Sequence, residues 1–108
     1  MILVEGLFDY AVLWRAGFRN VTGSLGKHLN AYQFRQLCDG CARTVYVTFD
    51  ADHNGSGQHA AQWLAGRLRE QGVNACRICL PEGHDPNRFF IQGGDAQQFQ
   101  RLLEEARP

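Results

Sequence analysis

A strand-like segment that ends in two closely spaced carboxylates constrains this chain more than any other feature. Residues 44–57 read TVYVTFDADHNGSG, in which apolar residues alternate up to Phe49 and are followed by Asp50 and Asp52. Side chains two residues apart in a strand point to the same face, so both carboxylates can converge on one point. At the carboxyl edge of a parallel sheet, where ligands bind, such a pair is suited to Mg²⁺ or Mn²⁺. The alternative interpretation is that both acids are solvated loop residues, one of which caps the helix that begins near Ser56.

Segments of strand length alternate with segments of helical periodicity along the whole chain. The expected strands are residues 2–4, 20–25, 44–49 and 75–80, and the expected helices are 8–16, 31–37, 56–71, 88–92 and 95–106. This alternation predicts right-handed βαβ units. The predicted fold class is therefore α/β, with a four-stranded parallel sheet covered by helices on both faces.

Acidic residues follow three of the four expected strands. Glu5 follows the first strand, Asp50 the third and Asp85 the fourth, while Asp9 lies one helical turn beyond Glu5 and can reach the same cleft. Acids from separate strands that meet at one edge repel one another unless a divalent cation neutralises them. The recurrence of acids at strand ends therefore predicts a metal site.

Two of these acids also have structural interpretations. Asp9 lies in the first turn of a helix, where negative charge is favourable. Asp85 precedes Pro86, which is typical of a helix N-cap followed by proline at the first helical position. For Asp85 the capping role and the metal role can coexist.

A glycine-containing turn after the second expected strand carries Lys27 and His28. In one interpretation these side chains contact a phosphate or nucleotide from the carboxyl edge of the sheet. In the other they are incidental polar residues of an exposed turn. The sequence leaves both interpretations open.

Four cysteines form two CxxC pairs, Cys38/Cys41 and Cys76/Cys79, a spacing that is also found in zinc ribbons. Cys76 and Cys79 fall inside the strand expected over 75–80, where a separation of three residues places them on opposite faces. Buried free thiols are therefore the favoured interpretation.

Length and charge bound the class of protein. The chain has 108 residues, enough for one domain but small for a complete multi-step enzyme, so we expect a piece of a longer protein. Its formal net charge is zero, so any attraction to phosphates must be local or carried by a metal. Because no apolar run reaches membrane-spanning length and the first apolar run ends at Glu5, we expect a cytoplasmic protein without a membrane segment.

The order and spacing of the motifs resemble the Toprim domain. This fold is shared by bacterial-type DNA primases, type IA and type II topoisomerases, OLD-family nucleases and recombination mediators. The segments EGLFD, GSLG, VTFDADHNG and LPEGHDP are most similar to the primase branch, including the primase-like modules of phage and plasmid proteins. Because the resemblance covers nearly the whole chain, we expect residues 1–108 to form a single Toprim catalytic domain excised from a longer primase-like protein.

The resemblance implies roles for individual residues. Glu5 matches a glutamate of acid/base or metal-linked catalysis, and Asp50 and Asp52 match the metal-binding pair. Asp9 and Asp85 match further acidic positions of the primase centre, which would also ligate metal. Many primases carry a second acid where this chain has Asn87, whose amide oxygen can reach a metal but brings no charge.

The function implied by the resemblance is metal-dependent nucleotidyl transfer during RNA primer synthesis for DNA replication. The implied cofactor is Mg²⁺ or Mn²⁺, and the implied partners are a single-stranded DNA template, nucleoside triphosphates and, through other domains, a replicative helicase. Lys27, His28 and Asn87 are the expected nucleotide or nucleic-acid contacts. We expect the 108-residue fragment alone to make little or no primer.

Three other functions remain open. A Toprim nuclease would use the same acids to activate water, and a topoisomerase would need a nucleophilic tyrosine from another domain. A degenerate Toprim module would serve only as a docking surface. The presence together of Glu5, Asp50 and Asp52 argues against degeneracy, because docking does not require all three.

Overall fold

Strands and helices alternate along the chain as far as the fourth strand, as the sequence pattern predicts. The computed structural model describes residues 1–24, 29–39, 44–51 and 54–106. The strands in these ranges are β1 (Ile2–Val4), β2 (Val21–Gly23), β3 (Thr44–Thr48) and β4 (Asn74–Arg77). The helices are α1 (Leu7–Arg15), α2 (Ala31–Asp39), α3 (Ser56–Glu70), α4 (Pro86–Ile91) and α5 (Ala96–Glu105).

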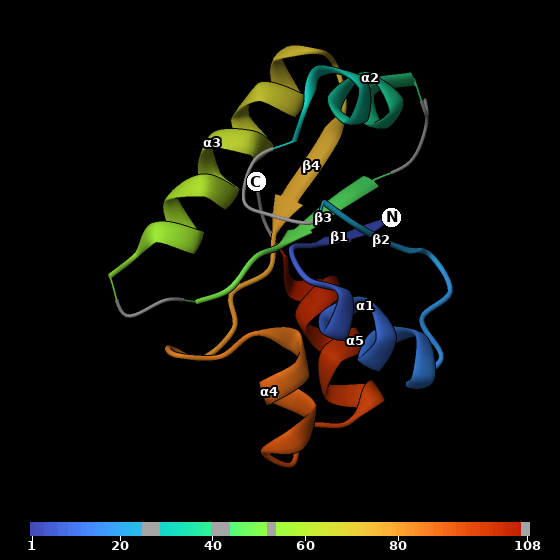
Figure 1. Cartoon of the computed structure of the whole chain (residues 1–108), viewed down its shortest axis with the longest axis vertical. Helices are drawn as coiled ribbons and strands as arrows, with labels where there is room; N and C mark the ends of the chain where they lie inside the picture. Colours follow the sequence, from blue (N-terminus) through green and yellow to red (C-terminus); the bar gives the residue numbers. More distant parts are fainter. Residues whose placement is uncertain (25–28, 40–43, 52–53, 107–108) are drawn as a thin grey trace.

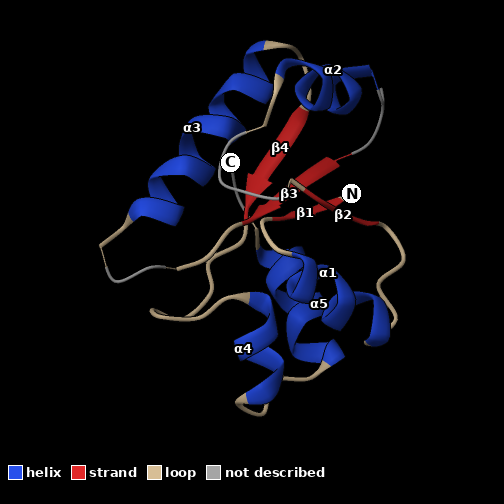
Figure 2. Cartoon of the chain, in the orientation of Figure 1, coloured by secondary structure: helices blue, strands red, loops and turns tan. Residues whose placement is uncertain are grey.

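The strands form one parallel sheet in the order β2-β1-β3-β4 (Figure 2). Strand β1 lies in the interior of the sheet, where Leu3 is paired with Thr22 on one side and with Val47 on the other. All three residues of β1 are buried, which explains why this strand is apolar at every position. The predicted fold class, a four-stranded parallel sheet between helices, is confirmed.

The two faces of the sheet are covered by different helices (Figure 1). Alternate residues of β1 point to opposite faces, so Leu3 joins one hydrophobic cluster while Ile2 and Val4 join the other. Helices α2 and α3 pack over the Leu3 face, and α1, α4 and α5 pack over the Ile2 face. Each face therefore has a separate hydrophobic core.

Helix α3 is the longest helix among the described residues. Its buried residues recur at helical spacing and face the sheet: Gly57, Ala61, Leu64, Ala65 and Leu68. The helix ends where Gly72, at a φ of +82°, turns the chain into β4. Throughout the described part of the chain, no helix has the length and apolar character needed to cross a membrane.

The edge strands are shorter than the sequence predicts. Strand β2 covers Val21–Gly23 because its partner β1 offers only three residues for pairing. Strand β4 ends at Arg77 instead of residue 80, because its partner β3 ends at Thr48.

The early end of β4 changes the environment of the second cysteine pair. Cys76 lies in the strand and is buried, whereas Cys79 lies beyond the strand and is exposed. The prediction of buried free thiols therefore holds for Cys76 and is wrong for Cys79. In the first pair, Cys38 is half-buried and Cys41 lies outside the described residues.

The fully buried position of Leu68 predicts a large effect of truncation. Leu68→Ala should lower the free energy of unfolding by about 2–5 kcal/mol, because it leaves a cavity between α3 and the sheet. Leu7→Ala is the matched control, since Leu7 is 68% exposed and its truncation should cost no more than about 0.5 kcal/mol. Urea unfolding of both variants measures the two values. Equal losses would contradict the packing of α3 described here.

Candidate metal centre

Asp50 is positioned by the end of β3. The strand stops at Thr48, and the chain continues past Phe49 to bring Asp50 to the carboxyl edge of the sheet. There the backbone N–H of Asp50 donates a hydrogen bond of 2.8 Å to Oε1 of Glu5. Glu5 follows β1, the neighbour of β3, so the two strand ends are joined by this bond.

Asp9 reaches the same edge from α1. Its side chain is only 5% exposed, although it is charged and lies in the first turn of the helix. Its Oδ1 accepts a hydrogen bond of 3.0 Å from the backbone N–H of Asn87. Gly6, the N-cap of α1, leaves room for this carboxylate, because a Cβ at that position would lie 3.2 Å from Oδ2 of Asp9.

Asp85 is the N-cap of α4, as the sequence predicts. Its Oδ1 accepts a hydrogen bond of 2.7 Å from the backbone N–H of Arg88, and Pro86 occupies the first turn. One oxygen serves this cap, so the other remains available to a ligand at the edge of the sheet.

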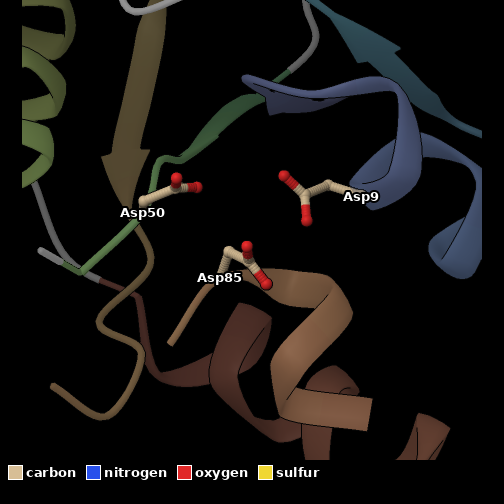
Figure 3. A group of neighbouring side chains, drawn as sticks. All are labelled: Asp9, Asp50 and Asp85. Atoms are coloured by element: carbon tan, nitrogen blue, oxygen red, sulfur yellow. The ribbon is translucent and has the colours of Figure 1, made fainter. Parts of the chain in front are cut away.

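Asp9, Asp50 and Asp85 converge on one point (Figure 3). One carboxylate oxygen from each residue lies within 4.8 Å of the others. In the described part of the chain, this is the one group of three or more His, Cys, Asp or Glu side chains with such geometry. Three carboxylate oxygens are hard ligands, which fit Mg²⁺ or Mn²⁺ and do not fit a metal that prefers sulfur.

The cluster changes the protonation of its most buried member. Burial raises the pKa of Asp9 from 3.8 to about 6, the hydrogen bond from Asn87 opposes this rise, and the charges of Asp85 and Glu5 add to it. Two charged carboxylate oxygens 4.8 Å apart have a repulsion energy of about 3 kcal/mol at an effective dielectric constant of about 20. A cation bound between them would remove that repulsion.

The structure places five of the eight residues that the sequence analysis singles out. Asp9, Asp50 and Asp85 come together, and Glu5 lies beside them through its bond to the Asp50 N–H. Asn87 lies beside the cluster, where its backbone N–H donates a hydrogen bond to Asp9. The other three lie outside the described residues: Asp52, Lys27 and His28.

The main-chain N–H of Asn87 is part of the site and was not expected from the sequence. A signal was available, because Asp85 and Pro86 mark a helix start, and the first N–H groups of a helix have no partner within it. Nothing local identifies Asp9, 78 residues away, as the acceptor of that N–H.

Comparison with protein families explains this arrangement. Residues 2–90 match a family model described as Toprim-like. The chain belongs to the Toprim-like family. This match spans all four described strands, helices α1–α3 and α4 except its last residue, and it includes every member of the acidic cluster.

The similar proteins of known sequence are DNA primases. The Toprim domain is 34% identical to the DNA primase of Aquifex aeolicus over 105 residues, which are 97% of this chain and 20% of that protein. It is 37% identical to the DNA primase of Clostridium acetobutylicum over 106 residues, 98% of this chain and 17% of that protein. The predicted resemblance to the primase branch is confirmed, and the chain spans about a fifth of the length of these relatives.

Solved structures show the same likeness. The zinc-binding and RNA polymerase domains of the Aquifex aeolicus primase superpose with a TM-score of 0.82 at 34% identity, over 98% of this chain and 25% of that one. A DNA primase domain from Pseudomonas aeruginosa gives a TM-score of 0.76 at 25% identity, over 100% of this chain and 34% of that one. The Toprim domain is thus homologous to part of the catalytic core of DNA primases.

The raised pKa of Asp9 predicts a pH-dependent stability without metal. The folded chain binds a proton at Asp9 more tightly than the unfolded chain, so the contribution of Asp9 to stability falls as the pH rises from 3.8 to about 6. Asp9→Asn keeps an acceptor for the Asn87 N–H but cannot titrate. The variant should therefore gain stability relative to the wild type across this window, by at most about 3 kcal/mol.

Urea unfolding with chelator, at about pH 4 and about pH 7.5, measures this difference. The same difference between the two proteins at both values would show that Asp9 titrates normally.

Proposed function

We propose that this chain supplies the metal-binding acidic edge of a DNA primase, where nucleotides are joined during RNA primer synthesis. The observation that carries the proposal is that carboxylate oxygens of Asp9, Asp50 and Asp85 lie within 4.8 Å of one another. They meet at the carboxyl edge of the sheet, in a domain that is homologous to part of DNA primases. The carboxyl edge of an open parallel sheet is also where ligands bind in other α/β folds.

In this proposal the three carboxylates hold Mg²⁺ or Mn²⁺ and Glu5 acts beside them. A divalent cation bound there supplies Lewis-acid stabilisation of the charge on the reacting phosphates. Glu5 keeps Asp50 in place by accepting a hydrogen bond from its backbone N–H, and Glu5 is proposed to take part in acid/base or metal-linked catalysis. Asp52, two residues after Asp50 in the sequence, is proposed as a further ligand.

The proposed partners are a single-stranded DNA template and nucleoside triphosphates. The chain has no net charge, so it cannot attract phosphates by a general excess of basic residues, and the cation provides the necessary positive charge. Lys27, His28 and the side chain of Asn87 are proposed as additional nucleotide or nucleic-acid contacts. A replicative helicase would bind through other parts of a longer protein.

We further propose that residues 1–108 act as a single catalytic domain within such a longer chain. The Aquifex aeolicus primase is about five times as long, and this chain covers 25% of the solved structure that holds the zinc-binding and RNA polymerase domains of that protein. The isolated domain should therefore bind metal but make little or no primer.

Two aspartates with the same structural role offer a sharp test of metal binding. Asp85 caps α4 and belongs to the acidic cluster, whereas Asp95 caps α5 and does not. Asparagine caps a helix as well as aspartate does, so neither Asp85→Asn nor Asp95→Asn should alter folding appreciably. Asp85→Asn should weaken Mn²⁺ binding by about ten-fold or more, and Asp95→Asn should leave it unchanged.

Calorimetric titration of the wild type and both variants with Mn²⁺ and Mg²⁺ measures these affinities. Similar affinities for all three proteins would mean that Asp85 is a helix cap only.

Primer synthesis can be tested in a chimera. This chain would replace the matched segment of the Aquifex aeolicus primase, to which it is 34% identical. The chimera should synthesise labelled oligoribonucleotides on a single-stranded template with nucleoside triphosphates and Mg²⁺ or Mn²⁺. The same chimera with Asp50→Asn should be inactive, because the cluster has lost a ligand.

Failure of a folded, metal-binding chimera to make primer would contradict the primase proposal. Template cleavage in its place would indicate a Toprim nuclease.

A further inference from the structure

The loops that carry Asp50 and Asp85 are joined to each other by their backbones. The N–H of Ala51 donates a hydrogen bond of 2.8 Å to the carbonyl of His84, and the N–H of Gly83 donates one of 2.6 Å to the carbonyl of Ala51. Ala51 directly follows Asp50, and His84 directly precedes Asp85. The two bonds, which we call the loop clamp, therefore tie together the backbones that carry two members of the acidic cluster.

The sheet itself does not fix these two residues relative to each other. Strand β3 ends at Thr48 and β4 ends at Arg77, so Asp50 and Asp85 both lie beyond the paired strands. Before the loop clamp, the last hydrogen bond between β3 and the segment after β4 runs from the Ile78 N–H to the Val47 carbonyl, at 3.1 Å. Between Ile78 and Asp85 the chain runs through six residues without strand pairing.

A tight turn makes the loop clamp possible. The N–H of His84 donates a hydrogen bond of 3.0 Å to the carbonyl of Pro81, and Gly83, the third residue of this turn, has a φ of +79°. A turn of this type requires positive φ at its third position, where glycine is favoured. This turn presents both the Gly83 N–H and the His84 carbonyl to Ala51. Residues with a Cβ would strain it, except for the few, such as asparagine, that tolerate positive φ.

The Ala51 side chain supports the same arrangement. It is 5% exposed and belongs to the hydrophobic cluster that contains Ile78 and Leu80, both from the segment after β4. The two loops are thus held by apolar packing as well as by the loop clamp.

We propose that Gly83 is a positioning residue for the acidic cluster: its left-handed turn holds the loop clamp, which sets the separation of Asp50 and Asp85. This inference rests on the proposed function, because the separation matters for a cation held between the two carboxylates. Gly83 does not touch that cation and acts only through the backbone of Ala51 and His84.

The test compares two glycines with the same backbone conformation. Gly83→Ala places a Cβ on a residue with a φ of +79°, and Gly72→Ala places one on a residue with a φ of +82°. Gly72 follows α3 and lies away from the acidic cluster, and a Cβ added there would have no other atom within 4 Å. Both variants pay a similar backbone penalty, but only the first opens the loop clamp. Gly83→Asn is the conservative variant, because asparagine tolerates the left-handed conformation.

Two readouts are measured on the whole 108-residue chain under conditions where every variant is folded. The first is Mn²⁺ affinity by electron paramagnetic resonance, and the second is hydrogen exchange of the Ala51 amide without metal. Gly83→Ala should bind Mn²⁺ about ten-fold more weakly than Gly72→Ala, and Gly83→Asn should recover most of this loss. The Ala51 amide should be protected in the wild type and in Gly72→Ala and should lose its protection in Gly83→Ala.

The two readouts separate failure of this inference from failure of the proposed function. A wild type that binds no Mn²⁺ would overturn the proposed metal centre, while the Ala51 exchange would still decide whether Gly83 holds the loop clamp. Equal Mn²⁺ affinity in Gly83→Ala and Gly72→Ala would overturn the inference. Weakened binding in Gly83→Ala with Ala51 still protected would overturn it as well, because the effect would not pass through the loop clamp.

Discussion

Repulsion between carboxylates is the constraint on which the carboxyl edge of this sheet depends. Glu5, Asp9 and Asp85 each accept a hydrogen bond from a main-chain N–H, either just after β3 or in the first turn of α4. Hydrogen bonds from N–H groups to charged acceptors are among the strong ones in proteins, and these offset part of the cost of gathering like charges. The main chain therefore holds the acidic side chains in place before any cation binds.

This arrangement explains why short segments of low regularity surround the site. Strand β1 has three residues and α4 has six, yet both present chain ends where N–H and carboxylate groups meet. The cluster draws one side chain from α1 and two from loops, and these elements are connected by hydrogen bonds in which a main-chain N–H is the donor. Rigid support of this kind is what a metal site needs from its surroundings.

Local sequence signals predicted the parts of the fold that local chemistry decides. The strand over Ile2–Val4, the helix cap at Asp85 and the position of Asp50 after a strand all follow from neighbouring residues. The exposure of Cys79 did not follow, because the end of β4 is set by the length of its partner strand. The burial of Asp9 likewise depends on a contact 78 residues away, which no local pattern encodes.

The pairing of loops after β3 and β4 was also beyond sequence reasoning. A glycine before His84 indicates a turn, but nothing in the turn names Ala51 as its partner. The recurrence of acids at strand ends, together with the expected parallel sheet, predicted that Asp9, Asp50 and Asp85 lie at one edge, and the family resemblance assigned the same residues to one site. The main-chain contacts that hold these residues together are visible only in the structure.

The division of the core by the sheet has a consequence for how such a domain can change over time. Asp9 lies on α1 and Asp85 caps α4, on the side that α1, α4 and α5 cover, whereas the cluster under α2 and α3 reaches the site only through Phe49, the residue before Asp50. Substitutions under α2 and α3, other than at Phe49, can therefore accumulate, or be introduced by engineering, with stability as the main quantity at stake. The opposite side has far less freedom, because a shift of α1 or α4 moves an acidic ligand with it. One layer of the molecule is thus open to evolutionary drift while the other is tied to chemistry.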